Sequence, residues 1–241
     1  MEKNKPIVLQ SGVNLVDGVE QALLDYIVEN KLAVGDSIPY ENELSELTGA
    51  SRHVVREALS RLKSRGIVVG KKHCGMRLAE PCIGSELDKA VVPQLLSVKT
   101  LVDLLELRIT LEQSIVPMIL ARITDADIAD LKRILDAKGT DDVVQSVDFE
   151  QEFHSRIYSI TGNAVMVNIM KVLLPVFRYI HDNVSDFRKF NDGIKNSGPQ
   201  GSHDDIVQAI ESRDPARLAL MMKLHLSSYV MYAEEFRRKN A

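Results

Sequence analysis

The chain has 241 residues, of which 45% are hydrophobic and 27% charged, with a formal net charge of −4, which is typical of a folded globular chain of one or two domains rather than a disordered one. Its longest apolar run, Val165–Phe177, is interrupted by Asn168, Lys171 and Pro175, and its N-terminus lacks the pattern of a signal peptide. Two cysteines are too few for a disulfide scaffold, so we expect a cytoplasmic protein that does not associate with a membrane.

The first 80 residues predict three helices followed by a β-hairpin. Ser51 is placed to cap the start of the third helix, and Gly66 to end it. The turn Lys71–Gly75 separates two short segments that favour strand. The predicted elements are helices over 14–32, 41–48 and 52–65 and strands over 67–70 and 76–79.

Positive charge is concentrated in this part of the chain. Residues 1–80 carry 11 Lys+Arg and 11 Asp+Glu, yet residues 50–77 carry eight basic residues and one acidic residue, Glu57. Such a cluster is typical of either a solvated helix face or a surface that binds a polyanion. The pattern within the third helix decides between these two interpretations.

The predicted third helix has one apolar face and one basic face. The apolar face can pack on the first two helices, whereas the opposite face presents Arg52, His53, Arg56, Ser60 and Lys63. A short capped helix of this kind fits the major groove of DNA, where arginine can bridge the O6 and N7 atoms of guanine. The predicted hairpin tip would contact the adjacent backbone or minor groove through its basic residues Lys71, Lys72 and His73.

The stretch Gly35–Leu62, followed by Gly66 and Gly75, resembles the winged helix-turn-helix of the GntR family of bacterial transcription regulators. The resemblance implies that Arg52 and Arg56 contact operator DNA. It implies the same for Ser51 and for the wing residues around His73 and Gly75. One departure is Asn42, where many relatives carry Arg, so one phosphate or base contact is expected to be weaker or different.

The remainder of the chain predicts an antiparallel bundle of helices without strands. A linker over 81–84 would join a DNA-binding domain over 1–80 to a helical effector-binding and dimerisation domain over 85–241, so the expected fold is mainly α. Residues 190–201 are expected to form one long loop. The predicted helices cover 87–96, 100–122, 125–136, 141–161, 164–186, 202–212 and 215–238.

Three predicted helices each direct an imidazole toward the apolar centre of this bundle. Glu150 and His154 lie one turn apart on the apolar face of one helix, and His203 and His225 occupy the apolar faces of two others. Each histidine alone is explained by a hydrogen-bonded core position. Together, however, three inward imidazoles and a carboxylate suit a divalent cation such as Zn, Ni, Mn or Fe, and an octahedral ion would keep positions open for a small ligand.

Further polar side chains share the apolar faces of their helices. Arg108 and Glu112 lie on one stripe, which is consistent with a buried ion pair or with a guanidinium that clamps a ligand carboxylate. Arg178 and His181 would line the same cavity, with a simple core position as the alternative for His181.

The pattern Arg108-x-x-x-Glu112, Glu150-x-x-Phe-His154, His203 and His225 resembles the FCD effector domain of the FadR subfamily, in the branch that binds metal. The resemblance implies a metal held by one carboxylate and three histidines, with a small carboxylate metabolite beside it. This chain has Glu150 where that branch has Asp, and the longer side chain puts the identity of the metal in question. Relatives that bind long-chain acyl-CoA lack the histidines, which disfavours that ligand.

We therefore expect a transcription regulator, specifically a repressor, that acts as a homodimer on a palindromic operator in double-stranded DNA. Its effector would be an organic acid or sugar acid held by the metal and Arg108. Two alternatives are a metal-dependent hydrolase or lyase, and a regulator whose metal is purely structural.

Overall fold

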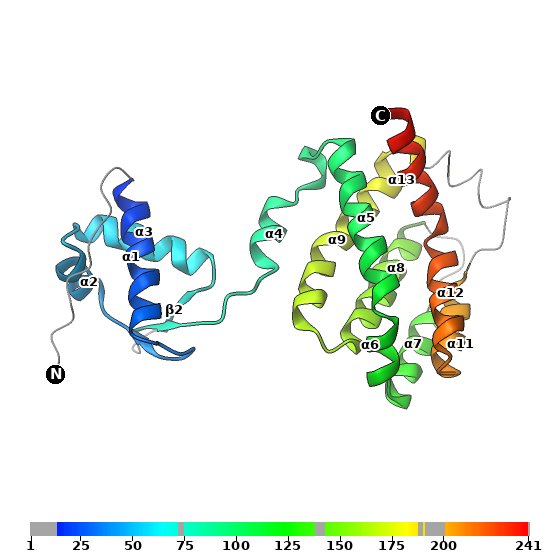
Figure 1. Cartoon of the computed structure of the whole chain (residues 1–241), viewed down its shortest axis with the longest axis horizontal. Helices are drawn as coiled ribbons and strands as arrows, with labels where there is room; N and C mark the ends of the chain where they lie inside the picture. Colours follow the sequence, from blue (N-terminus) through cyan, green and yellow to red (C-terminus); the bar gives the residue numbers. More distant parts are fainter. Residues whose placement is uncertain (1–13, 72–74, 138–142, 188–189, 191–200, 241) are drawn as a thin grey trace. The chain divides into compact units, whose positions relative to one another are not determined.

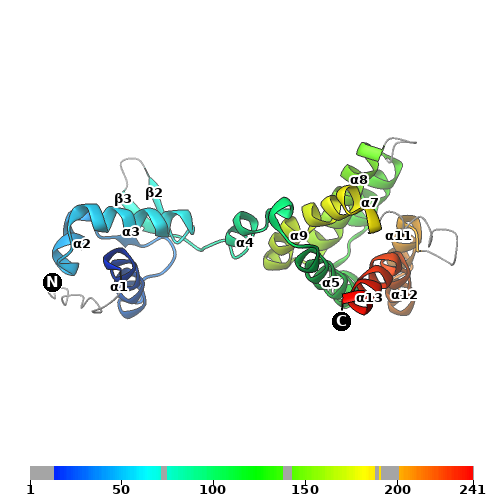
Figure 2. The ribbon, with the colours of Figure 1, turned by 90° about the horizontal axis from the view of Figure 1, so that it is seen from above.

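The computed structural model describes residues 14–71, 75–137, 143–187, 190 and 201–240 of the chain. Contacts divide the chain into two compact units, Met1–Cys82 and Ile83–Ala241. We refer to them as the N-terminal unit and the helical unit and describe each by itself (Figures 1 and 2).

The N-terminal unit combines three helices with a small antiparallel sheet. The strand order is β1-β3-β2, with Ile38 opposite Met76 and Val69 opposite Arg77. The hairpin prediction is confirmed, whereas β1 was not predicted, since its two residues are too short to show an alternating pattern. The elements are α1 Leu15–Glu29, β1 Ser37–Ile38, α2 Glu41–Thr48, α3 Arg52–Ser64, β2 Val68–Lys71 and β3 Gly75–Leu78.

Local capping fixes the turn between α2 and α3. Gly49 ends α2 in the left-handed conformation, with a φ of +68°, and the Ser51 side chain accepts a hydrogen bond from the Val54 amide at the start of α3. The four apolar residues of α3 that we expected to face inward are each at most 1% exposed, and they pack against α1 and the sheet: Val55, Ala58, Leu59 and Leu62. Burial of this face leaves the opposite side of α3 to solvent.

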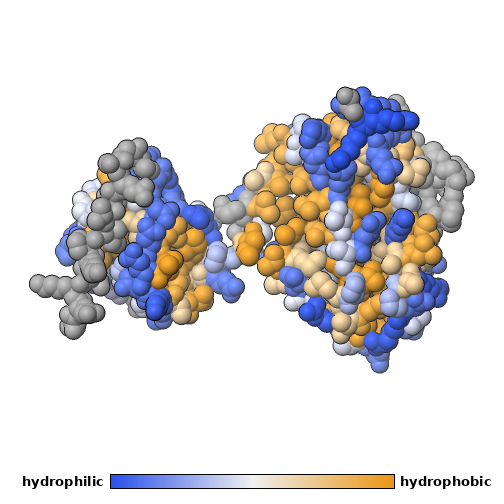
Figure 3. All heavy atoms as spheres, in the orientation of Figure 1, coloured by the Kyte–Doolittle hydropathy of each residue, from blue (hydrophilic) through white to orange (hydrophobic). Residues whose placement is uncertain are grey.

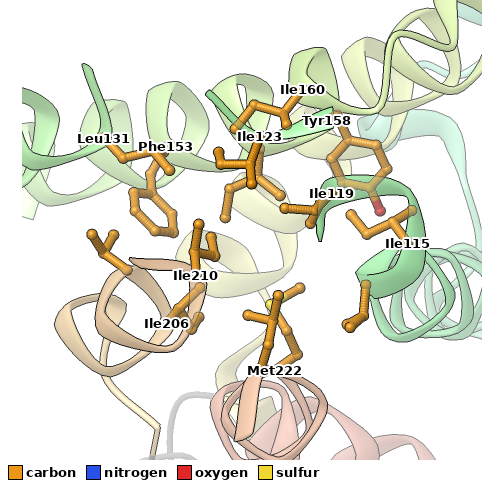
Figure 4. Packing of buried hydrophobic residues seen from close by; sticks show 14 of the residues in the cluster. Ile115, Ile119, Ile123, Leu131, Phe153, Tyr158, Ile160, Ile206, Ile210 and Met222 are labelled. Atoms are coloured by element: carbon orange, nitrogen blue, oxygen red, sulfur yellow. The ribbon is translucent and has the colours of Figure 1, made fainter. Parts of the chain in front are cut away.

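The helical unit is a bundle whose largest core lies between α6, α7, α8, α9, α11 and α12. Figure 4 shows Ile119, Phe153, Ile206 and Met222 converging there from four of these helices. The elements are α4 Ser85–Ala90, η1 Pro93–Leu95, α5 Val98–Ser114, α6 Val116–Arg122, α7 Asp125–Asp136, α8 Val143–Ile160, α9 Ala164–Asn183, α11 His203–Glu211, α12 Pro215–His225 and α13 Ser227–Asn240.

Three segments predicted as single helices, 87–96, 100–122 and 215–238, are interrupted, and the segment 164–186 is broken at Val184, so those predictions were wrong in detail. Pro93 and Pro117 lie in the first turn of η1 and α6, and each lacks the N–H that would continue the preceding helix. The third break, at Leu226, has no proline. There the Ser227 hydroxyl donates to the Leu224 carbonyl at 2.7 Å, which competes with the regular helical bonds.

Helix α9 is the one helix in the described ranges that is long and apolar enough to cross a membrane by length and composition. Its polar residues and Pro175 argue against a membrane span. Seven of its side chains are buried, and they pack against α8 and α5. The core helix of a globular bundle passes the same test, so α9 is weak evidence for a membrane span.

Candidate functional sites: a basic helix and a histidine cluster

The exposed side of α3 carries the basic residues that the sequence singled out. Ser51, Arg52, His53 and Arg56 are all exposed at the start of the helix. The Arg56 guanidinium donates from Nε and Nη2 to the same carboxylate oxygen of Glu41 on α2, at 3.2 and 3.1 Å. This end of α3 therefore presents two guanidinium groups and an imidazole to solvent.

The wing is described only in part. Lys72 and His73 lie outside the described residues, and Lys71 is the last residue of β2. Gly75 opens β3 with a φ of +74°, and a Cβ there would lie 3.2 Å from the Tyr40 hydroxyl. The structure thus gives Gly75 a conformational reason to be glycine, and it places the base of the wing beside the start of α2.

Glu150, His154, His203 and His225, which we call the histidine cluster, come together from α8, α11 and α12. Each offers one ligand atom, and these atoms all lie within 4.8 Å of one another. Nε2 of His154 lies 3.4 Å from the Glu150 carboxylate, and Nε2 of His203 lies 3.3 Å from it. The two histidines are buried, whereas the Glu150 side chain is 43% exposed, so the cluster reaches solvent on the side of Glu150.

Polar neighbours influence which imidazole nitrogens of the cluster carry hydrogen. Nδ1 of His225 lies 3.0 Å from the Gly201 carbonyl, and Nδ1 of His154 lies 3.1 Å from the Glu112 carboxylate. The Gly201 carbonyl only accepts hydrogen bonds, so Nδ1 of His225 is a donor and its Nε2 bears a lone pair in the neutral ring. His154 has a carboxylate near each ring nitrogen, Glu112 at Nδ1 and Glu150 at Nε2, so in its neutral form one of the two nitrogens lacks a hydrogen. These two Nε2 atoms face each other at 3.3 Å. A proton or a metal cation between them is needed to relieve the repulsion.

Packing holds the ring of His203 in place. The Phe149 and Phe153 rings lie edge-on to it, with centroids at 4.9 and 4.5 Å. The backbone at Gly201 is equally constrained, because a Cβ there would lie 2.5 Å from the Met221 carbonyl oxygen. Glycine at this position therefore allows the chain to approach α12 closely enough for the bond to His225.

Buried charges extend from the cluster into α5. Arg108 and Glu112 are 3% and 0% exposed and form an ion pair through Nε of Arg108, and the guanidinium lies 3.7 Å from the centre of the Phe177 ring. Burial by itself would raise the pKa of Glu112, but Arg108 and His154 lower it to about 2. Burial opposes the charged form of His154, yet Glu112 raises its pKa above the usual value. Burial, with His154 and His203, lowers the pKa of His225 to about 3.

The predicted effector residues are not all placed together. Arg108 contacts Glu112 of the buried network, and among the described residues only Glu112 accepts a hydrogen bond from it, through Nε. His181 instead lies 3.0 Å from the Asp182 carboxylate and beside Phe187, with 37% of its side chain exposed. Arg178 is half-buried on α9.

Two tyrosines and two hydrogen-bond acceptors were missed from the sequence. The Tyr158 hydroxyl is fully buried without a hydrogen-bond partner among the described residues, and Figure 4 shows it directed toward Ile115 and Ile119. Burial and the nearby Glu112 carboxylate raise the pKa of Tyr158, and burial raises that of Tyr229 to about 12. The contact of Glu112 with His154 and that of Gly201 with His225 join different elements, so no helical periodicity could reveal them.

A winged helix-turn-helix joined to a bundle with this buried cluster defines a two-domain DNA-binding regulator. The model of the family described as "Bacterial regulatory proteins, gntR family" matches residues 15–78, and that of the FCD domain matches residues 103–228, more than half of the chain. The chain therefore belongs to the GntR family, in the subfamily that carries an FCD domain. Members of this family regulate transcription, so the alternative of a metal-dependent enzyme is excluded: the chain is not a hydrolase or lyase.

Individual relatives agree with this assignment. The HTH-type transcriptional repressor NanR of Salmonella arizonae is 29% identical over 231 residues, covering 94% of this chain and 87% of the relative. NanR of Salmonella typhimurium is 29% identical over 219 residues, covering 89% and 82%. Among solved structures, Streptococcus agalactiae GntR aligns with a TM-score of 0.56 and 26% identity, covering 88% of this chain and 97% of that one.

The buried pair of α5 yields a prediction about stability. Glu112→Gln leaves Arg108 buried without its carboxylate, so we expect the free energy of unfolding, measured by urea denaturation, to fall by roughly 3–5 kcal/mol. Adding Arg108→Met should recover most of the loss. The control is Glu106→Gln on the same helix, whose partner Arg237 is exposed, and it should cost less than about 1 kcal/mol. Equal losses in the two single variants would contradict the prediction.

Proposed function

We propose that the protein is a repressor that binds an operator as a homodimer and responds to a small carboxylate effector bound beside a divalent metal ion. The observation that carries the metal proposal is the pair of facing Nε2 atoms of His154 and His225. In our assignment, residues 1–80 bind DNA, residues 81–84 link the domains, and residues 85–241 bind the effector and dimerise. The protein would act in the cytoplasm, where its operator lies.

The exposed basic face of α3 supports the assignment of DNA contacts. Ser51, Arg52, His53 and Arg56 would contact the operator from α3, and Lys71, Lys72, His73 and Gly75 from the wing. One such head reads only a half-site, so two-fold pairing of chains would match a palindromic operator. The relatives that are named repressors favour repression over activation.

The donor set supports a metal ion. Glu150, His154, His203 and His225 would hold it, with Nδ1 of His154 facing Glu112 and Nδ1 of His225 facing the Gly201 carbonyl. Imidazole nitrogens and one carboxylate suit Zn, Ni, Mn or Fe. The ion would supply a Lewis acid for an effector oxygen. Glu112 and Gly201 orient the rings, as hydrogen-bonding partners behind metal ligands generally do.

Charge balance supports an anionic effector. A divalent cation and Arg108 together would carry three positive charges against the two carboxylates of Glu112 and Glu150. The excess positive charge in a buried region favours an anion, and the Nη groups of Arg108 can accept a carboxylate as a bidentate partner. An organic acid or sugar acid fits both requirements. In this proposal Arg178 and His181 approach the effector from α9.

An unpartnered apolar face supports dimerisation through the helical unit. Figure 3 shows apolar side chains gathered on the face of this unit that carries α5 and α9. Exposed apolar side chains of this unit include Leu95, Val98, Leu107 and Val165. Large exposed apolar areas on soluble proteins typically mark protein interfaces, and we assign this one to a second copy of the chain.

DNA binding is tested by substitutions on α3. Arg52→Ala and Arg56→Ala should each weaken binding to a duplex selected by the wild-type protein from a random library, by about 1–3 kcal/mol. Fluorescence anisotropy measures the affinity. The control is Arg133→Ala, which removes the same charge from an exposed position on α7. Wild-type affinity in both α3 variants would refute the assignment of this face.

Metal binding is tested by removing two ligands. The wild-type chain, loaded and then desalted, should retain about one divalent ion per chain, and the His154→Ala, His203→Ala double variant should retain almost none, as measured by plasma mass spectrometry. His181→Ala is the matched control, because this histidine lies outside the cluster and should leave the metal content unchanged. A double variant with full metal content would refute the site.

Effector binding is tested by thermal shift with a panel of organic and sugar acids. Binding acids should stabilise the metal-loaded protein by about 2.7 kcal/mol at a hundredfold excess over the dissociation constant, and chelation should abolish the effect. The double variant Arg108→Met, Glu112→Gln removes the ion pair as a unit and should lose the response. If it instead keeps the full shift, Arg108 does not clamp the effector. A full shift that also survives chelation would leave the metal a purely structural role.

A further inference from the structure

Two exposed arginines at the start of α3 differ in their surroundings. Arg52 has no acidic partner in the described part of the chain, whereas Arg56 is held by Glu41, the first residue of α2. The contact links two helices, fifteen residues apart in the sequence. Because 68% of the Arg56 side chain is exposed, such an ion pair contributes little to stability, and a role in stability is a poor explanation for it.

The contact occupies only one edge of the guanidinium. A single oxygen of Glu41 accepts from both Nε and Nη2, at 3.2 and 3.1 Å. The terminal edge, formed by Nη1 and the second hydrogen of Nη2, stays free. That edge carries two parallel N–H donors, which match the O6 and N7 acceptors of guanine in the major groove.

We propose that Glu41 is a positioning residue that directs the free edge of Arg56 to a guanine base and prevents this arginine from binding phosphate. Arg52, without a carboxylate, is then the arginine of the pair that is free to contact the DNA backbone. This inference rests on the proposed function, because it assumes that the exposed face of α3 enters the major groove.

Electrostatic repulsion explains why Arg56 would bind a guanine base in preference to a phosphate. A phosphate that approaches Arg56 also approaches the Glu41 carboxylate, and the two anions repel each other. Helix α2 provides no relief, because it carries Glu41, Glu43 and Glu46 but no lysine or arginine. A guanine edge is uncharged and meets no such repulsion. The N-terminus of α2 stabilises the negative charge of Glu41, which keeps the carboxylate beside Arg56.

Restriction of the Arg56 side chain before binding adds to this preference for guanine. A free arginine side chain loses rotamer entropy when it binds, which reduces its contribution to affinity. Glu41 restricts the Arg56 side chain before DNA arrives, so less freedom is lost when the guanidinium meets the correct base. At a wrong base the same restraint prevents the side chain from swinging away to a phosphate. Both consequences raise specificity rather than total affinity.

The experiment compares full-length wild type with Glu41→Gln, Glu41→Asp and the control Glu46→Gln, an exposed glutamate on the same helix. Each is combined with Arg56→Ala in a double-mutant cycle. Fluorescence anisotropy over a series of KCl concentrations gives the affinity for two probes. One is the duplex enriched by the wild type from a random library, and the other is a random duplex of equal length.

We expect Glu41→Gln to reduce the ratio of the affinity for the enriched duplex to the affinity for the random duplex about fivefold or more. The main reason is that the variant would bind the random duplex more tightly. The salt dependence for the random duplex should steepen by about 0.9 in log–log slope for each guanidinium that is freed. Glu41→Asp retains the charge but is too short to hold Arg56, so it should also lower the ratio. Glu46→Gln should not, and in the Arg56→Ala background Glu41→Gln should have no effect.

Two results would overturn the role of Glu41: equal effects of Glu41→Gln and Glu46→Gln, or an effect of Glu41→Gln that persists without Arg56. Failure of the proposed function, DNA binding by α3, would give a different result. In that case Arg52→Ala and Arg56→Ala would bind both duplexes as the wild type does.

Discussion

The two imidazole nitrogens that face each other at 3.3 Å are the constraint on which the helical unit depends. Their lone pairs repel unless a proton or a metal cation lies between them, and the geometry that creates this demand is distributed over three helices and a residue just before a fourth. Helix α5 supplies Glu112, α8 supplies His154, α12 supplies His225, and Gly201 precedes α11. In the proposed function, occupancy of the histidine cluster by a metal ion and the packing of these helices would therefore be linked.

The same buried charges connect the histidine cluster to the rest of the unit. Arg108 lies over Phe177 of α9 and 6.0 Å from the ring of Tyr229 on α13, within the core that joins α5, α9 and α13. Helix α9 in turn packs against α4 and η1 at the start of the unit, and a Cβ on Gly84 just before them would lie 2.8 Å from that of Asn168. An effector that engages Arg108 would therefore act on helices that contact the residues just after the linker. A ligand shifts only equilibria between states that it binds unequally, so in the proposed function the effector would bind one arrangement of these helices more tightly than another.

The sequence was most informative where periodicity and capping act locally. The helices over 41–48 and 52–65 and the hairpin are confirmed, because glycine in the left-handed conformation and a serine cap define their ends within a turn. Helical projection also predicted that Glu150 and the three histidines would lie together. It could not predict that Glu112 and Gly201 contact the imidazole nitrogens, since those contacts depend on how helices cross. Periodicity likewise continued through Pro117 and Leu226, because the apolar face is maintained while the backbone breaks.

Both candidate sites use the same arrangement of polar groups. In the N-terminal unit, Glu41 holds Arg56 by the Nε edge and leaves the terminal edge free. In the helical unit, Glu112 lies against Nε of Arg108 and Nδ1 of His154, so Nε2 of His154 faces Glu150 and His225 in the histidine cluster. In each case a carboxylate of the protein holds one side of the group, so in the proposed function less conformational freedom would be lost when its other side meets a partner. The exposed pair of Glu41 and Arg56 adds little to stability, so substitutions there should alter recognition alone. The bundle folds only if the charges of the buried pair, Glu112 and Arg108, stay matched. Substitutions in the buried pair should therefore alter folding and recognition together.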